Sequence, residues 1–99
     1  MNKLSPQVRN LIHCLNQLQN ADIIIEVHEK SPVNILTDEP VALPADDEPV
    51  FFYKDHFESL LKEIEKIKFG QIILKIRDFR FLEMKSYQKI RLQVKNAAE

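Results

Sequence analysis

The stretch that most constrains the fold is residues 69–77, Phe-Gly-Gln-Ile-Ile-Leu-Lys-Ile-Arg, where a helical pattern gives way to a strand pattern. Upstream, over about residues 53–68, apolar side chains recur every three or four positions, as on a helix with one buried face. The stripe consists of Phe57, Leu60, Leu61, Ile64 and Ile67. The helix is expected to end at Gly70, the only glycine. From Gln71 to Arg77 the apolar positions alternate, which predicts a strand with one face buried.

The first half of the chain repeats this order of patterns. Ser5 followed by Pro6 is a helix-start signal, since serine caps free N–H groups and proline fits the first helical position. A helical apolar stripe follows and predicts a helix that ends near Asn20. The stripe consists of Val8, Leu11, Ile12, Leu15 and Leu18. The β-branched run at 23–27 predicts a largely buried strand, hairpinned to a shorter one at 33–37.

Shifting the first half by 49 positions places its helical stripe and its strand on those of the second half without a gap. This match predicts a duplicated α-β-β unit. The alternative is that two helix–strand units of similar length share a pattern without common ancestry. Both alternatives place two helices against an antiparallel sheet.

After Arg77 the sequence allows two turns. A turn of two residues at 78–79 would put Glu83 beside Leu74, whereas a turn of three residues that includes Arg80 keeps apolar residues together. The longer turn is therefore expected. It pairs Ile76 with Leu82, Leu74 with Met84, and Lys75 with Glu83.

A further alternating run at 87–94 predicts one more strand, with Ile90, Leu92 and Val94 inward. The expected fold class is α+β, with two amphipathic helices on one face of an antiparallel sheet of four to five strands. Residues 1–99 are expected to form one domain, since the chain is too short for two cores. Within it, pseudo-repeats 5–37 and 54–94 would be joined by an acidic, proline-containing loop at 38–50.

Composition narrows the class of protein. With 44% hydrophobic and 29% charged residues, the chain reads as globular. No apolar run approaches the ~20 residues that span a bilayer, and the amino terminus lacks a secretory apolar core. A cytoplasmic location is therefore expected. The net charge of -1 is unevenly distributed along the chain. Residues 1–50 hold three basic and eight acidic side chains, whereas residues 51–99 hold eleven basic and seven acidic ones.

Residues 60–78, together with 88–92, resemble the YezD-like family of small bacterial proteins. The shared features are an amphipathic helix, an aromatic-glycine pair, an apolar strand, a turn and a second strand, over about the last 40 residues. Where that family tends to Asp-Gly, this chain has Asp78 followed by Phe79, and phenylalanine resists the positive φ of a tight turn. The resemblance implies no established activity and no catalytic residues.

One group of residues suggests a binding surface. Lys75, Arg77, Lys89 and Arg91 are expected on one side of adjacent strands, with Phe81 and Tyr87 close by. Basic and aromatic side chains together can contact phosphates and stack on bases. The candidate contacts for an anion or nucleic acid are therefore Lys75, Arg77, Tyr87, Lys89 and Arg91.

Other chemistry is not predicted. The histidines and Cys14 show no recognised ligand spacing, and the acidic loop lacks the pattern of a calcium site. No catalytic residue, metal or cofactor is expected, and Cys14 reads as a small buried side chain. The single cysteine also excludes an internal disulfide.

Two functions are open at this point. The first is a non-enzymatic protein–protein interaction or regulatory module that self-associates, with no membrane or small-molecule partner. The alternative is a nucleic-acid-binding regulator that uses the basic sheet face. Against the alternative stand the net charge of -1 and Glu83 on the same face.

Overall fold

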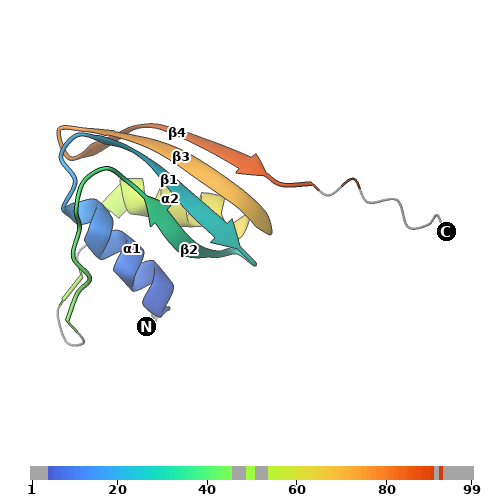
Figure 1. The fold of residues 1–99 in the computed structure, drawn as a ribbon, viewed down its shortest axis with the longest axis horizontal. Coiled ribbons are helices and arrows are strands. Elements are labelled where there is room, and N and C mark those ends of the chain that lie inside the picture. Colours follow the sequence, from blue (N-terminus) through green and yellow to red (C-terminus); the bar gives the residue numbers. More distant parts are fainter. Residues whose placement is uncertain (1–4, 46–48, 51–53, 91, 93–99) are drawn as a thin grey trace.

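The computed structural model describes residues 5–45, 49–50, 54–90 and 92, which form two helices and one antiparallel sheet of four strands (Figure 1). The elements, in chain order, are α1 (Pro6–Asn16), β1 (Ala21–His28), β2 (Ser31–Leu36), α2 (Lys54–Glu65), β3 (Phe69–Arg77) and β4 (Arg80–Gln88). The strand order is β2-β1-β3-β4, so each hairpin contributes one central and one edge strand. In this part of the chain, no helix is long and apolar enough to cross a membrane.

Helix α1 begins where the sequence predicts it. Oγ of Ser5 accepts a hydrogen bond from the backbone N–H of Val8 at 3.2 Å, and Pro6 occupies the first turn. The serine thereby satisfies one of the N–H groups that a helix start leaves without an internal partner. The helix ends at Asn16, short of the predicted end near Asn20.

The hydrophobic core lies between the helices and the inner face of the sheet. Helices and central strands both contribute to it, because their apolar residues recur at the helical or strand period. The core residues are Leu11, Ile12, Leu15, Leu18, Ile23, Ile25, Val27, Phe57, Leu60, Ile64, Ile67, Ile72, Leu74 and Ile76. Among the described residues, no buried side chain is polar or charged. Burial of apolar area, worth about 25 cal/mol per Å², therefore holds the elements together.

Gly70 lies inside β3, not at the end of a helix. Helix α2 ends at Glu65, and β3 begins at Phe69. The backbone of β4 passes so close that a Cβ on Gly70 would lie 2.0 Å from the carbonyl oxygen of Tyr87 and 2.9 Å from Cα of Gln88. The close approach of two strands therefore explains the glycine.

The described residues form four strands, so the fifth strand that the expected fold class allows is not supported. Residues 87 and 88 belong to β4, which runs from Arg80 to Gln88, and the described residues 89, 90 and 92 lie in no strand. Ile90 and Leu92, predicted to point inward, are 76% and 92% exposed. Val94 lies outside the described residues, and no fifth strand occurs among those that are described.

The expectation is also wrong in its helices and its repeat. Both helices supply core side chains, but only α1 packs along a strand, β2. Helix α2 approaches β4 and β2 at fewer points, and Oγ of Ser86 donates to Oε1 of Glu63 at 3.1 Å. The duplicated α-β-β unit is not supported, because α2 approaches both β2 and β4 whereas α1 packs along β2, and β2 has six residues where β4 has nine.

The turn between β3 and β4 has two residues, Asp78 and Phe79, in place of the predicted three. Both have positive φ, 58° and 65°, as a tight hairpin turn requires. Gln19 and Asn20, which precede β1, accept hydrogen bonds from the turn. The N–H of Asp78 donates to Oδ1 of Asn20, and the N–H of Phe79 donates to the carbonyl of Gln19, both at 3.0 Å. These bonds hold Phe79 in a conformation that phenylalanine rarely adopts.

A bulge in β4 follows the turn. Ile76 pairs with Phe81, not with Leu82 as predicted, and Lys75 pairs with Glu83, so Leu82 is the extra residue. Beyond the bulge the predicted pairs Lys75–Glu83 and Leu74–Met84 are confirmed. The sequence therefore indicates the correct register for most of β4, although the predicted turn is one residue too long, because the bulge at Leu82 restores the register.

The described parts of segment 38–50 contain no helix or strand, but they are anchored to α1. The side-chain amide of Gln17 both donates to the carbonyl of Ala42 at 2.8 Å and accepts from its N–H at 3.1 Å. Arg9 donates to the carbonyl of Ala45 at 2.9 Å. Val41 and Val50 pack against the core. This segment is thus part of the packed structure as well as a connection.

Replacing Gly70 by alanine is expected to lower the free energy of unfolding by about 1–3 kcal/mol, because the new methyl group would meet the backbone of β4. Urea denaturation would measure the loss. Gln71→Ala is the control, since residue 71 is only partly buried and already carries a Cβ. Equal stabilities of the two variants would contradict the close approach of β3 and β4.

Replacing Phe79 by glycine is expected to raise the free energy of unfolding by about 1 kcal/mol, since glycine adopts positive φ without a steric cost. Arg80→Gly, at the next position and without positive φ, should destabilise. Both changes can be followed by urea denaturation. A less stable Phe79→Gly chain would show that contacts of the ring outweigh the strain of the turn.

Candidate functional site

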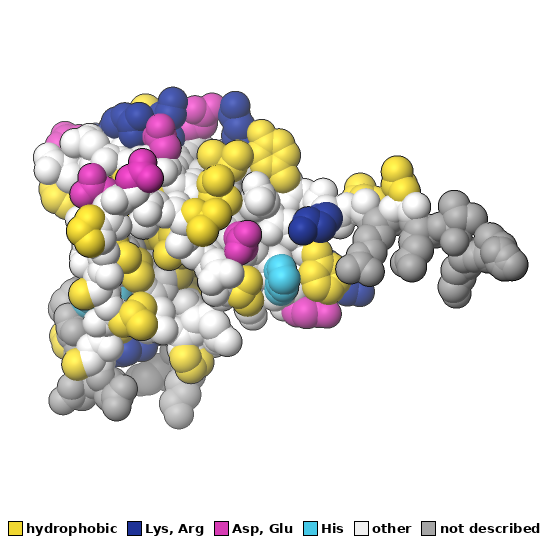
Figure 2. Space-filling model, in the orientation of Figure 1, with side chains coloured by type: hydrophobic (Ala, Val, Ile, Leu, Met, Phe, Trp, Pro, Cys, Tyr) yellow, Lys and Arg dark blue, Asp and Glu magenta, His cyan; other side chains and the backbone are white. Residues whose placement is uncertain are grey.

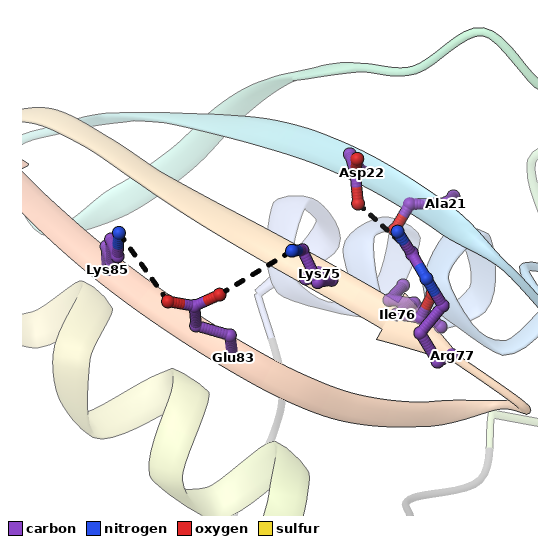
Figure 3. Close-up of polar contacts among 7 residues, drawn as sticks. All are labelled: Ala21, Asp22, Lys75, Ile76, Arg77, Glu83 and Lys85. Carbon is purple, nitrogen blue, oxygen red and sulfur yellow. Dashed lines mark hydrogen bonds and ion pairs between the residues drawn. The ribbon is translucent and has the colours of Figure 1, made fainter.

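The candidate site is the outer face of the sheet, which is the face opposite the core. Side chains alternate sides along each strand, so the residues between the buried ones form this second face. It comprises Asp22, Ile24, Glu26 and His28 on β1, Ser31, Asn34 and Leu36 on β2, Phe69, Gln71, Ile73, Lys75 and Arg77 on β3, and Arg80, Glu83, Lys85 and Tyr87 on β4. Figure 3 views this face, with the helices behind the sheet.

An apolar row crosses the middle of the outer face. Leu36 pairs with Ile24, and Ile24 pairs with Ile73, so three aliphatic side chains lie side by side on β2, β1 and β3. Leu36 is 51% and Ile73 36% exposed. Hydrophobic side chains also gather among charged ones on the side shown in Figure 2. A row of this kind on a sheet face is typical of a contact surface.

Ion pairs flank the row on one side (Figure 3). Nη1 of Arg77 lies 3.0 Å from Oδ1 of Asp22, which joins β3 to β1. Glu83 on β4 lies between two lysines, with Oε1 3.8 Å from Nζ of Lys75 and Oε2 3.5 Å from Nζ of Lys85. Lys75, Arg77 and Lys85 are therefore already paired with carboxylates.

The predicted binding residues have different outcomes. Lys75, Arg77 and Tyr87 all lie on the outer face, but Tyr87 pairs with Gln71, four residues along β3 from Lys75. Lys89 lies beyond the end of β4, where its N–H donates to the carbonyl of Phe69 at 2.6 Å, and Arg91 lies outside the described residues.

Phe81, expected near the basic residues, lies on the opposite face of the sheet. Its ring packs edge-on against Phe57 of the core, with centroids 5.2 Å apart. The bulge at Leu82 explains this, because one extra residue changes the face on which the preceding side chains lie. Phe81 is therefore a core contact and not part of a base-stacking surface.

Sequence reasoning missed Asp22, Ile24 and Leu36 as members of the site. The run from Ile23 to Ile25 is apolar at every position, so its pattern does not show which side chain faces out. The pairing with β3 shows which side chain faces out. Ile73 lies between two buried residues and therefore faces out, and its cross-strand partner Ile24 lies on the same face. The signal was therefore present in the second half of the chain.

The histidines and Cys14 give no second chemical site. The ring of His28 contacts Phe69 and that of His56 contacts Phe81, with centroids 5.5 and 5.7 Å apart. Within the described part of the chain, no three histidine, cysteine or acidic residues are grouped so that they could hold a metal ion. Cys14 is 3% exposed, and burial raises the pKa of its thiol.

Two hollows lie away from the centre of the outer face. One, of about 360 Å³, lies between α1 and β2 and is lined by Leu11, Cys14 and Val33 among others. The other, of about 440 Å³, is polar and lies at the end of β1, beside Asp38 and Glu39. Both are open, and neither collects residues of one recognisable chemistry.

No family model matches this chain, and neither a curated protein nor a solved structure matches it. The resemblance of residues 60–78 to the YezD-like family therefore stays a prediction. The argument for function depends on the geometry of the outer face.

Native Cys14 is expected to react with iodoacetamide more than about tenfold more slowly than Cys14 in the urea-unfolded chain at the same pH. Burial limits access, and the raised pKa lowers the fraction of thiolate. Mass spectrometry of timed samples would measure both rates. Equal rates would contradict the packing of α1 against the core.

Proposed function

We propose that this protein is a non-enzymatic protein–protein interaction module of the cytoplasm, and that it self-associates through the outer face of its sheet. The observation that carries the proposal is the apolar row of Leu36, Ile24 and Ile73 on a face that neither described helix covers. Association with a second protein surface would remove this apolar area from water.

The distribution of charge supports a protein partner more than a nucleic acid. Arg77 and Lys75 already face Asp22 and Glu83, so a phosphate would have to displace a carboxylate from each cation. Non-specific nucleic-acid binding draws on uncompensated cations. The alternative function, a nucleic-acid-binding regulator, is therefore the weaker proposal.

The absence of buried polar groups among the described residues supports a non-enzymatic role. Catalytic groups usually owe their reactivity to burial and to perturbed neighbours. Among the described residues, the buried group with a raised pKa is Cys14, and burial favours its unreactive thiol form.

The change Ile73→Asp is expected to weaken self-association at least about tenfold, since it places a charge in the middle of the apolar row. Sedimentation equilibrium over a wide range of concentrations would measure the association constant. The matched control is Leu43→Asp, which alters an exposed leucine that is not one of the outer-face residues and lies beside the hollow between α1 and β2.

The unaltered chain and Leu43→Asp should associate alike. A chain that stays monomeric at every concentration would overturn the proposal. Loss of association in Leu43→Asp alone would move the interface to the hollow beside α1.

A further inference from the structure

We propose that the partner on the outer face is a second copy of this chain, packed face to face about a two-fold axis parallel to the strands. This inference rests on the proposed self-association and specifies its geometry. In this arrangement β1 of one copy lies over β3 of the other, and Asp22 faces the partner's Lys75.

The first argument is the unequal distribution of charge across the outer face. The half formed by β1 and β2 carries two carboxylates, Asp22 and Glu26, and no lysine or arginine among its outer-face residues. The half formed by β3 and β4 carries Lys75, Arg77, Arg80 and Lys85 against the single carboxylate Glu83. The face is therefore acidic on one side and basic on the other.

This polarity selects the direction of the symmetry axis. Rotation about an axis parallel to the strands reverses the strand order, so the acidic half of each copy covers the basic half of the other. Rotation about an axis that runs across the strands would instead place β1 over β1, with carboxylates facing carboxylates. Unlike charges across an interface favour association, and like charges suppress it.

The second argument is the register of β1 and β3. Ile24 pairs with Ile73, and Asp22 pairs with Lys75, within one sheet. An axis that passes between these two strands places each β1 residue over the partner's copy of its own cross-strand neighbour. The aliphatic pair therefore meets the partner's aliphatic pair, while Asp22 meets Lys75.

The area of the face fits a weak dimer. Four strands about 4.8 Å apart and about eight residues long, at ~3.3 Å per residue, cover roughly 500 Å² on each copy. The two copies together would bury about 1,000 Å², which is at the lower limit for a specific interface. Stacked sheets of this kind pack about 10 Å apart with strands nearly aligned.

The ion pairs within one chain do not prevent this contact. Asp22 is 65% and Lys75 42% exposed as side chains, so both keep accessible surface for a partner. Exposed pairs of this kind contribute little to the stability of the single chain. Their charges can therefore be shared across the interface.

Exchange of charges between copies tests the axis. Asp22→Lys alone places lysine over the partner's Lys75, and Lys75→Glu alone places glutamate over the partner's Asp22. Each variant is expected to associate at least about tenfold more weakly than the unaltered chain. An equimolar mixture of the two is expected to recover association to within about threefold, because both contacts of the mixed dimer join opposite charges.

Sedimentation equilibrium would measure the association constants, and native mass spectrometry with one ¹⁵N-labelled variant would identify the mixed dimer. The matched controls are Glu58→Lys and Lys62→Glu, which reverse exposed charges on α2 and should leave association unchanged. Circular dichroism would show that each variant is folded.

A double variant tests the same axis where a single variant fails to fold. The chain with both Asp22→Lys and Lys75→Glu keeps opposite charges within its own sheet. It should dimerise with itself and fail to pair with the unaltered chain, since mixed contacts would join like charges.

The outcomes separate the two proposals. If the single variants dimerise like the unaltered chain, or if their equimolar mixture stays monomeric, the proposed two-fold axis is wrong, while the proposed self-association is not contradicted. A double variant that pairs freely with the unaltered chain would do the same. A monomeric unaltered chain would overturn both proposals.

Discussion

The structure depends on the antiparallel pairing of β1 with β3. This ladder joins the two hairpins along eight residue pairs, from Ala21 with Ile76 to His28 with Phe69. On its inner face it gathers the aliphatic side chains that both helices cover, and on its outer face it aligns Ile24 with Ile73. A slip of one residue would exchange the two faces, placing buried isoleucines in solvent and lysine in the core. Core and candidate surface are therefore set by the same register.

Each hairpin reaches this register with a tight turn and a bulge. Glu29 and Lys30 between β1 and β2 have positive φ, as do the two residues of the other turn. The N–H groups of Glu29 and Lys30 donate to carbonyls of residues 67–68, just before β3, so each turn is held by the connection that enters the other hairpin. Such contacts over long sequence separations let ordinary side chains occupy conformations that isolated turns leave to glycine or asparagine.

The sequence correctly predicted the features that depend on the local spacing of apolar residues. It failed where the conformation depends on contacts with backbone that is distant in the sequence. The helical stripes, the cap at Ser5 and the pairing of Lys75 with Glu83 follow from spacing alone, and the structure confirms them. The length of the turn at Phe79 was predicted wrongly, because the residues that hydrogen-bond to this turn lie before β1. Gly70 was wrongly taken as the end of a helix, because the close approach of the β4 backbone, which requires the glycine, does not show in the local sequence. The run at 87–94 alternates like a strand, yet β3 begins at Phe69, so among the described residues β3 offers no partner to Ile90 or Leu92.

The candidate surface combines an apolar row with ion pairs, and this combination has a physical consequence. An outer face that was apolar throughout would join any exposed hydrophobic surface, whereas a face of separate charges would stay hydrated. In the proposed dimer the aliphatic side chains would supply attraction, and the polarity from Asp22 to Lys85 would favour orientations that bring opposite charges together. Since the charges are exposed, they would add little to the affinity of the contact but would discriminate between correct and incorrect orientations of the partner. The arrangement is thus suited to weak, specific recognition and not to permanent assembly.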